Sequence, residues 1–86
     1  MYSLHFLPAA EQDLAQLDKV IAPRVINRIR WLAANLDNAR IQPLTGNLAG
    51  LYKLRTGDYR VLFELVREKE LIVIHAIGHR RDIYRG

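Results

Sequence analysis

Three strand-like runs near the C-terminus most constrain the fold. They are LYKLRT (51–56), YRVLFELV (59–66) and LIVIHAI (71–77), which are rich in β-branched and aromatic residues. Only Gly57-Asp58 separates the first two, and this pair suits a two-residue hairpin turn with glycine at the position that needs a positive φ. Because such short connections join antiparallel neighbours, the sequence predicts an antiparallel sheet of these three strands.

The N-terminal half predicts one further strand and two helices. Residues 2–7 alternate like a strand, and residues 8–37 have apolar residues at helical spacing, with Pro23 expected to end one helix and begin the next. Residues 41–50 are expected to form a loop. We therefore expect an α+β fold, in the order β-α-α-β-β-β, over one domain of residues 1–86. The helical hairpin should pack on one face of the antiparallel sheet, and the first strand should join an edge.

Composition excludes several classes of protein. The 86 residues suffice for a modest core, and half are hydrophobic, so a folded domain is expected and not a disordered chain. The chain has no cysteine and only three scattered histidines, which predicts neither a disulfide nor a metal site and fits a cytoplasmic protein. No run approaches the ~20 apolar residues of a membrane span. No motif for an organic cofactor is present.

The positive charge is concentrated in the second half of the chain. The formal net charge is +4, and residues 44–86 contain eight Lys or Arg against five Asp or Glu. This bias favours an anionic partner, either a nucleic acid or an acidic protein segment.

The predicted hairpin turn gathers cations on one face of the sheet. It places Arg55 opposite Arg60 and Lys53 opposite Leu62, and strand alternation then puts all three cations on the same face. The other face carries the residues that the helices should cover: Tyr52, Leu54, Tyr59, Val61, Phe63 and Leu65. Like charges facing each other across a hairpin are destabilising, so an anionic ligand would explain the pair. The alternative is a solvated basic face without a ligand.

The C-terminal segment should extend this cationic face. His79, Arg80, Arg81 and Tyr84 directly follow the last strand, which is expected at the centre of the sheet. Arginine forms bidentate hydrogen bonds with phosphate oxygens, and tyrosine or histidine can stack on an unpaired base. A phosphodiester is therefore the simplest ligand, with Arg55 and Arg81 as substrate-binding residues. His75, within the last strand, is expected to have only a structural role.

The segments LAGLYKLRTGDYRVLFEL and LIVIHAIGHRRDIY resemble the RelE/ParE superfamily of bacterial toxins, and in particular its RelE-like branch. The similarity extends over nearly the whole chain. It implies the fold given above, which is RelE-like or microbial-ribonuclease-like, and a toxin of a type II toxin–antitoxin system. It also implies a metal-independent endoribonuclease that cleaves mRNA in the ribosomal A site and so inhibits translation. An acidic, partly disordered antitoxin would hold it inactive in a hetero-oligomeric complex.

The resemblance also assigns roles to residues. Lys53 matches a lysine that acts as a base or stabilises charge, and Arg55 and Arg60 match arginines that hold the phosphate. Arg80 matches an arginine that assists the leaving group, and Tyr84 matches a tyrosine that stacks on or orients the base. The mechanism implied is attack of the ribose 2′-hydroxyl on the adjacent phosphorus, with loss of the 5′-oxygen.

Two points stay open at the level of sequence. His79 is the better general acid on chemical grounds, because imidazole exchanges a proton near neutral pH, so the acid and base among Lys53, His79 and Arg80 are not assigned. Some relatives carry a second lysine where this chain has Leu51. The alternatives are a ParE-like toxin that inhibits DNA gyrase without nuclease activity, and a basic protein-interaction module. The joint presence of Lys53, Arg60, His79, Arg80 and Tyr84 favours the nuclease.

Overall fold

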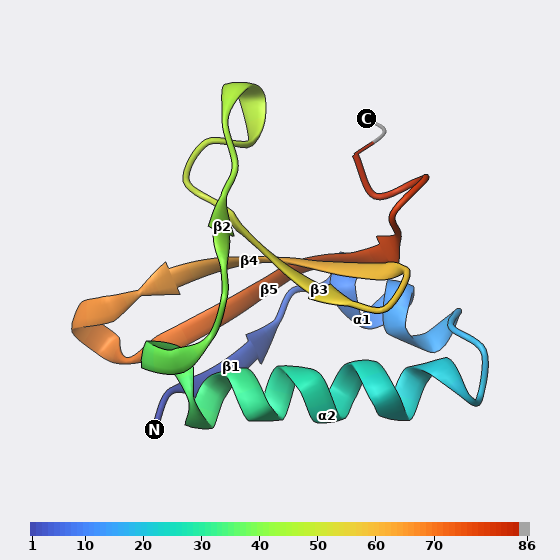
Figure 1. Ribbon diagram of the computed structural model, residues 1–86, viewed down its shortest axis with the longest axis horizontal. Coiled ribbons are helices and arrows are strands. Elements are labelled where there is room, and N and C mark those ends of the chain that lie inside the picture. The colour runs from blue at the N-terminus through green and yellow to red at the C-terminus, as the bar shows by residue number, and fades with distance from the viewer. Residues whose placement is uncertain (85–86) are drawn as a thin grey trace.

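A five-stranded sheet with two helices on one side makes up residues 1–84, which the computed structural model describes (Figure 1). The strand order is β1-β5-β4-β3-β2. The elements are β1 (Ser3–Phe6), α1 (Pro8–Ala15), α2 (Ile21–Ala34), β2 (Gln42–Pro43), β3 (Tyr52–Thr56), β4 (Tyr59–Val66) and β5 (Leu71–His79), with 3₁₀ turns η1 (Leu36–Asn38), η2 (Gly46–Leu48) and η3 (Arg67–Lys69).

The predicted hairpin is confirmed in its register. Arg55 pairs with Arg60, and Thr56 pairs with Tyr59, so Gly57 and Asp58 form the two-residue turn. Gly57 has a φ of 57°, a left-handed conformation that glycine adopts without steric cost. The turn therefore fixes which side chains of β3 and β4 share a face.

The hydrophobic core lies between the hairpin, β5 and the helices, as predicted. The side chains of Leu54, Val61 and Phe63 are fully buried on the helix side of the sheet. The residues that meet them there include Val25, Ile29 and Leu32 of α2 and Ile72, Ile74 and Ile77 of β5. The alternation of β3 and β4 thus directs apolar side chains to the helices and leaves the cations on the opposite face.

The first strand joins an edge as expected, but the sheet is mixed and not wholly antiparallel. β1 pairs parallel with β5, from Ser3 with Leu71 to Phe6 with Ile74. Local sequence specifies antiparallel pairing only across short turns, whereas β1 and β5 are far apart in the chain. Beyond Phe6 the edge of β5 is protected by α1, because the Asp13 Oδ2 accepts a hydrogen bond from the Ile77 N–H at 3.0 Å.

Two local predictions were wrong. The first helix ends at Ala15, and α2 already begins at Ile21, so Pro23 lies inside the first turn of α2 and does not separate the helices. Proline is tolerated there because the first N–H groups of a helix have no intrahelical acceptor. The expected loop 41–50 contains the short strand β2, whose Pro43 fits an edge position that needs no N–H donor.

Two segments rise from the side of the sheet that faces away from the helices. Figure 1 shows the β2–η2 segment and the C-terminal tail, residues 80–84, on that side, apart from each other. We call the sheet surface between them the open face; it includes Lys53, Arg60 and Leu62. It is partly covered, since Leu62 is only 3% exposed. Within residues 1–84, no helix is long and apolar enough to cross a membrane.

Candidate functional site

A buried arginine lies at the centre of the cationic face. Arg60 is only 8% exposed, and its Nη1 donates hydrogen bonds to the carbonyl oxygens of Gly57 and Tyr59, both at 2.9 Å. Among residues 1–84, no carboxylate lies within ion-pair distance of this guanidinium. Burying an unpaired charge is costly, and two carbonyls satisfy only part of the five N–H donors. The remaining donors and the full positive charge are suited to an anion.

Crowding between Arg55 and Arg60 is relieved by divergence of their side chains. The two residues are direct cross-strand partners, but Arg60 folds back onto the turn while Arg55 is exposed to solvent. The predicted pairing of the two arginines is confirmed, but the Arg60 side chain does not extend freely into solvent. The hairpin turn supplies backbone acceptors that hold this guanidinium in place.

The C-terminal tail brings Tyr84 to Lys53. The Lys53 Nζ lies 5.7 Å from the centroid of the Tyr84 ring, close enough for a cation–π contact. The tail can approach the sheet because Gly78, the partner of Arg60, has no side chain. A Cβ at Gly78 would lie 3.2 Å from the Cδ1 of Ile83. Tyr84 is 45% exposed, so its ring is available to a ligand on the open face.

Arg80 is anchored to the same hairpin turn. Its backbone N–H donates to the Asp58 carbonyl at 2.8 Å, and its Nε lies 3.7 Å from the Asp58 Oδ1. Both side chains are more than half exposed, so the ion pair holds Arg80 only loosely. The turn therefore positions two arginines, Arg60 and Arg80, which are distant in sequence. Arg81 is exposed farther along the tail.

His79 is not on the open face. It pairs with Tyr59, and the two rings meet edge to face with centroids 5.4 Å apart. Because Tyr59 packs against the core on the helix side, its partner projects to that side too. The His79 Nδ1 accepts a hydrogen bond from the Arg81 N–H at 3.1 Å. The expectation that the open face continues through His79 was wrong, because β5 pairs with β4 so that His79 lies opposite Tyr59 and Gly78 lies opposite Arg60.

Sequence reasoning missed a polar pair on the open face. The Nε2 of His75 in β5 lies 3.1 Å from the Oε1 of Glu64 in β4. The alternation of β4 could have placed Glu64 on the same face as Arg60. No sequence signal revealed the β-bulge that turns His75 toward it.

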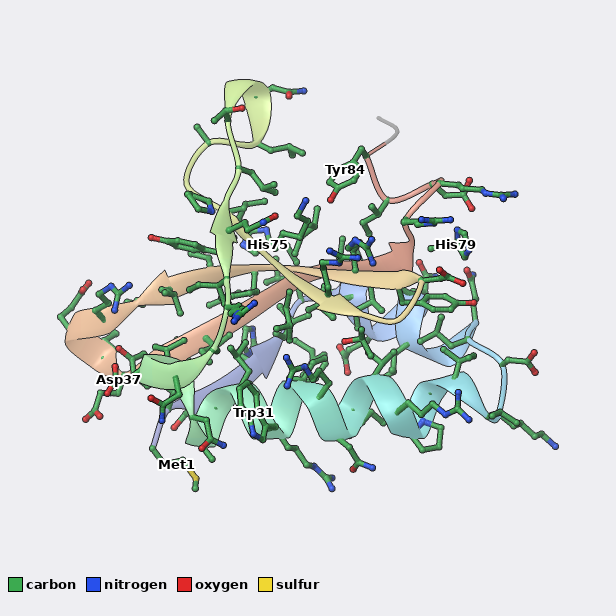
Figure 2. The ribbon with its side chains drawn as sticks, in the orientation of Figure 1. Met1, Trp31, Asp37, His75, His79 and Tyr84 are labelled. Atoms are coloured by element: carbon green, nitrogen blue, oxygen red, sulfur yellow. The ribbon has the colours of Figure 1, made fainter. Side chains whose placement is uncertain are left out.

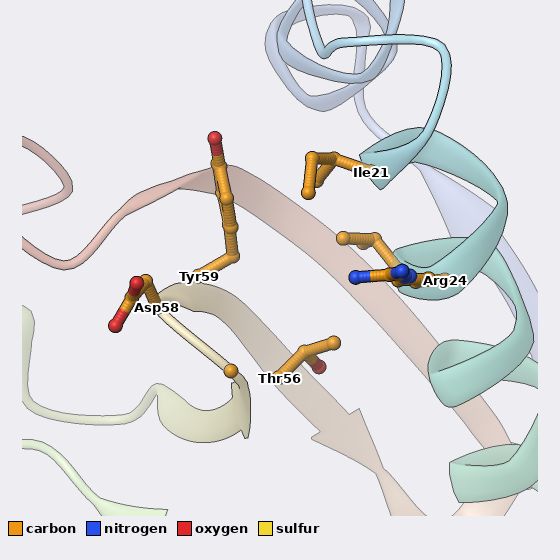
Figure 3. A pocket seen from close by; sticks show the side chains of 7 residues that line it. Ile21, Arg24, Thr56, Asp58 and Tyr59 are labelled. Carbon is orange, nitrogen blue, oxygen red and sulfur yellow. The ribbon is translucent and has the colours of Figure 1, made fainter.

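A separate hollow of about 240 Å³ lies behind the turn, between it and the start of α2 (Figure 3). Ile21 and Arg24 of α2 line it, together with Thr56, Asp58 and Tyr59 of the hairpin. It is on the helix side of the sheet and does not include Lys53, Arg60 or Tyr84. A ligand of the open face need not enter this hollow, because an extended polymer binds along a surface and does not need a deep pocket.

The open face can bind and stabilise a phosphoryl group. Arg60 offers a buried charge that the turn holds in place, Lys53 a half-buried ammonium and Arg80 an exposed guanidinium, while Tyr84 offers an aromatic surface. Within residues 1–84, no three His, Asp or Glu side chains converge as metal ligands do.

We expect phosphate or sulfate to raise the melting temperature more than chloride at equal ionic strength. An anion at ten times its Kd stabilises the folded state by about 1.4 kcal/mol, which corresponds to roughly 6–11 °C for a domain of this size. Thermal unfolding in matched salts measures the difference. The additional rise in melting temperature with phosphate or sulfate, compared with chloride, should shrink in an Arg55→Ala variant. It should persist in Arg67→Ala, because Arg67 lies in η3 at the other end of β4. Equal effects of all salts would contradict a preformed phosphate site.

Comparison with known proteins agrees with the fold. The family model described as the ParE toxin of a type II toxin–antitoxin system matches residues 4–84. Toxin RelG of Mycobacterium tuberculosis is 33% identical over 88 residues, covering 98% of this chain and 97% of the relative. Toxin RelE of the same organism is 29% identical over 84 residues, covering 98% and 87%.

Solved structures agree with these relatives. The toxin–antitoxin complex RelBE2 of M. tuberculosis contains a chain that superposes with a TM-score of 0.83 at 30% identity, over 92% of this chain and 98% of that one. The isolated RelE toxin of Escherichia coli superposes with a TM-score of 0.75 at 17% identity, over 100% and 88%, and so shares the fold. This chain therefore belongs to the RelE/ParE superfamily of type II toxin–antitoxin toxins.

Proposed function

We propose that this toxin is an endoribonuclease that cleaves mRNA in the ribosomal A site and thereby inhibits translation. The observation that carries the proposal is the buried guanidinium of Arg60, which has no carboxylate partner among residues 1–84 and faces a surface shared with Lys53 and Tyr84. A site built for binding alone does not need a buried, rigid charge. A developing phosphoryl charge is best stabilised by one.

The reaction requires little covalent chemistry from the protein. The ribose 2′-oxygen attacks the adjacent phosphorus, the bond from phosphorus to the 5′-oxygen breaks, and the products are a 2′,3′-cyclic phosphate and a 5′-hydroxyl. The protein must align the 2′-hydroxyl in line with the leaving oxygen, accept its proton, stabilise the phosphorane and protonate the leaving oxygen. In this proposal cationic side chains supply the positive charge that a metal ion supplies in other nucleases.

The side chains divide these tasks by their chemistry. Arg60 holds the nonbridging oxygens, because its charge is fixed and its position is set by the turn. Lys53 lies nearest the ring of Tyr84, on which a base can stack, and acts on the 2′-hydroxyl. Arg80 assists the leaving oxygen, and Arg55 and Arg81 hold flanking phosphates. His79 has no task on this face because it lies beside Tyr59.

An antitoxin is the second proposed partner. Relatives of known structure occur in toxin–antitoxin complexes, among them RelBE2. The basic second half of this chain favours an acidic, partly disordered antitoxin that covers the open face in a hetero-oligomeric complex. A purified complex whose antitoxin leaves Lys53, Arg60 and Arg80 accessible would contradict direct coverage.

Mapping of transcript ends after induced expression tests the nuclease. We expect new 5′-hydroxyl ends inside translated codons within minutes, and none from an Arg60→Ala chain expressed to the same level. Because the family model is described as a ParE toxin, inhibition of gyrase is the competing function. Intact transcripts with DNA breaks or altered supercoiling would favour that function, and no toxicity at all would favour a basic interaction module.

A further inference from the structure

A carboxylate and an imidazole meet on the open face. Glu64 of β4 and His75 of β5 contact each other at 3.1 Å, and their side chains are 46% and 32% exposed. Glu64 follows Arg60 and Leu62 along β4 at alternate positions, so all three project to the same side. Figure 2 shows His75 above the sheet, on the side away from α2.

A β-bulge aims His75 at this face. Leu62 pairs with Ala76 and Phe63 pairs with Ile74, which leaves His75 as the unpaired extra residue in β5. The preceding residue, Ile74, is fully buried against the helices, so the side chain of His75 points to the opposite face, which is the open face. Bulges re-aim side chains and are concentrated next to functional sites.

Stability does not account for this pair. A half-exposed ion pair or hydrogen bond of this kind contributes about 0–1 kcal/mol. A carboxylate on the same face as Lys53 and Arg60 also repels the phosphate that these cations would hold. Glu64 is therefore better explained by contact with a part of the ligand that donates hydrogen bonds.

We propose that Glu64 and His75 bind a nucleobase next to the scissile phosphate, with guanine preferred. The inference rests on the proposed nuclease function. Lys53, Leu62 and Ala76 are partners across three neighbouring strands, so His75 is about 10 Å from Lys53, or two strand spacings. That separation allows Lys53 to contact a phosphate while His75 contacts the base of the neighbouring nucleotide.

The chemistry of the pair selects the base. The imidazole of His75 offers a flat surface on which an unpaired base stacks. One oxygen of the Glu64 carboxylate contacts the His75 Nε2, and the carboxylate keeps free lone pairs that can accept two further hydrogen bonds. Guanine presents two parallel N–H donors on its Watson–Crick edge, N1–H and N2–H, whereas uracil presents one. Guanine therefore matches the carboxylate best.

Single-turnover cleavage on ribosomes of mRNAs that differ at one base tests the inference. Wild-type protein should favour guanine over uracil by about tenfold or more at one position beside the cut. Glu64→Gln retains an acceptor for His75 but loses the two carboxylate acceptors that would bind guanine together. The preference for guanine over uracil should therefore fall to within about twofold, while cleavage of uracil-containing sites persists. Glu68→Gln, in η3, is the matched control and should keep the wild-type preference.

The outcomes separate this inference from the function on which it rests. His75→Ala should weaken cleavage at all bases through lost stacking, whereas Trp31→Ala, which removes a partly exposed ring from α2, should not. Cleavage by wild-type protein without base preference, or an unchanged preference in Glu64→Gln, would overturn the inference alone. No cleavage by wild-type protein under any condition would overturn the nuclease function and the inference together.

Discussion

Replacement of Arg60 with alanine should lower single-turnover cleavage of mRNA on ribosomes by roughly two to three orders of magnitude, the usual effect of removing one preorganised charge donor. The guanidinium is held by the carbonyls of Gly57 and Tyr59, so its position needs no adjustment when charge develops on the phosphorane. Its burial strengthens the interaction, because water screens it little. Rapid-quench measurement with the toxin in excess isolates the chemical step.

Two comparisons show whether the loss is specific. Arg60→Lys should recover only part of the rate, since an ammonium cannot reproduce a bidentate guanidinium contact. Arg67→Ala, which removes an exposed arginine from η3, should cleave at the wild-type rate. Thermal unfolding of each variant separates lost catalysis from lost folding, because Arg60 also supports the turn. A wild-type rate for folded Arg60→Ala would refute the open face as the active site.

Much of this arrangement could be predicted from local sequence. The pair Gly57-Asp58 specifies a two-residue turn, the turn fixes the register of β3 and β4, and the register places Lys53, Arg55 and Arg60 on one face. Each step depends on contacts between residues near in sequence. The resemblance of the C-terminal segment then indicated Arg80 and Tyr84, which the tail brings to the hairpin.

The remaining features depend on long-range contacts. The Arg60 side chain folds back onto the turn because backbone carbonyl oxygens accept its hydrogen bonds. The order of residue types in the sequence does not predict such contacts. β1 pairs in parallel with β5, which is far from it in the chain, and the bulge at His75 interrupts the register between β4 and β5. The orientation of His79 follows from its pairing with Tyr59. Alternation along a strand predicts the face that a side chain occupies only where the paired residue on the neighbouring strand is known.

The position of His79 removes an otherwise attractive general acid from the open face. Imidazole is chemically suited to protonate a leaving oxygen, but this ring lies against Tyr59, and its Nδ1 already accepts the Arg81 N–H. Arg80 lies at the turn beside Arg60 and is exposed enough to reach the 5′-oxygen. Geometry therefore favours Arg80 for the leaving group, either by proton transfer or by charge stabilisation.

Arg80→Ala should lower cleavage by about 10²- to 10³-fold, and a substrate with sulfur in place of the 5′-oxygen should restore most of that rate. A thiolate leaves without protonation, so it needs no help from Arg80. The same substrate should not rescue Lys53→Ala, because attack of the 2′-hydroxyl still requires Lys53. His79→Ala should cleave both substrates within about threefold of wild type. Rescue of a defective His79→Ala variant by the sulfur substrate, with no rescue of Arg80→Ala, would instead assign the leaving group to His79 and require the end of β5 to rearrange when RNA binds.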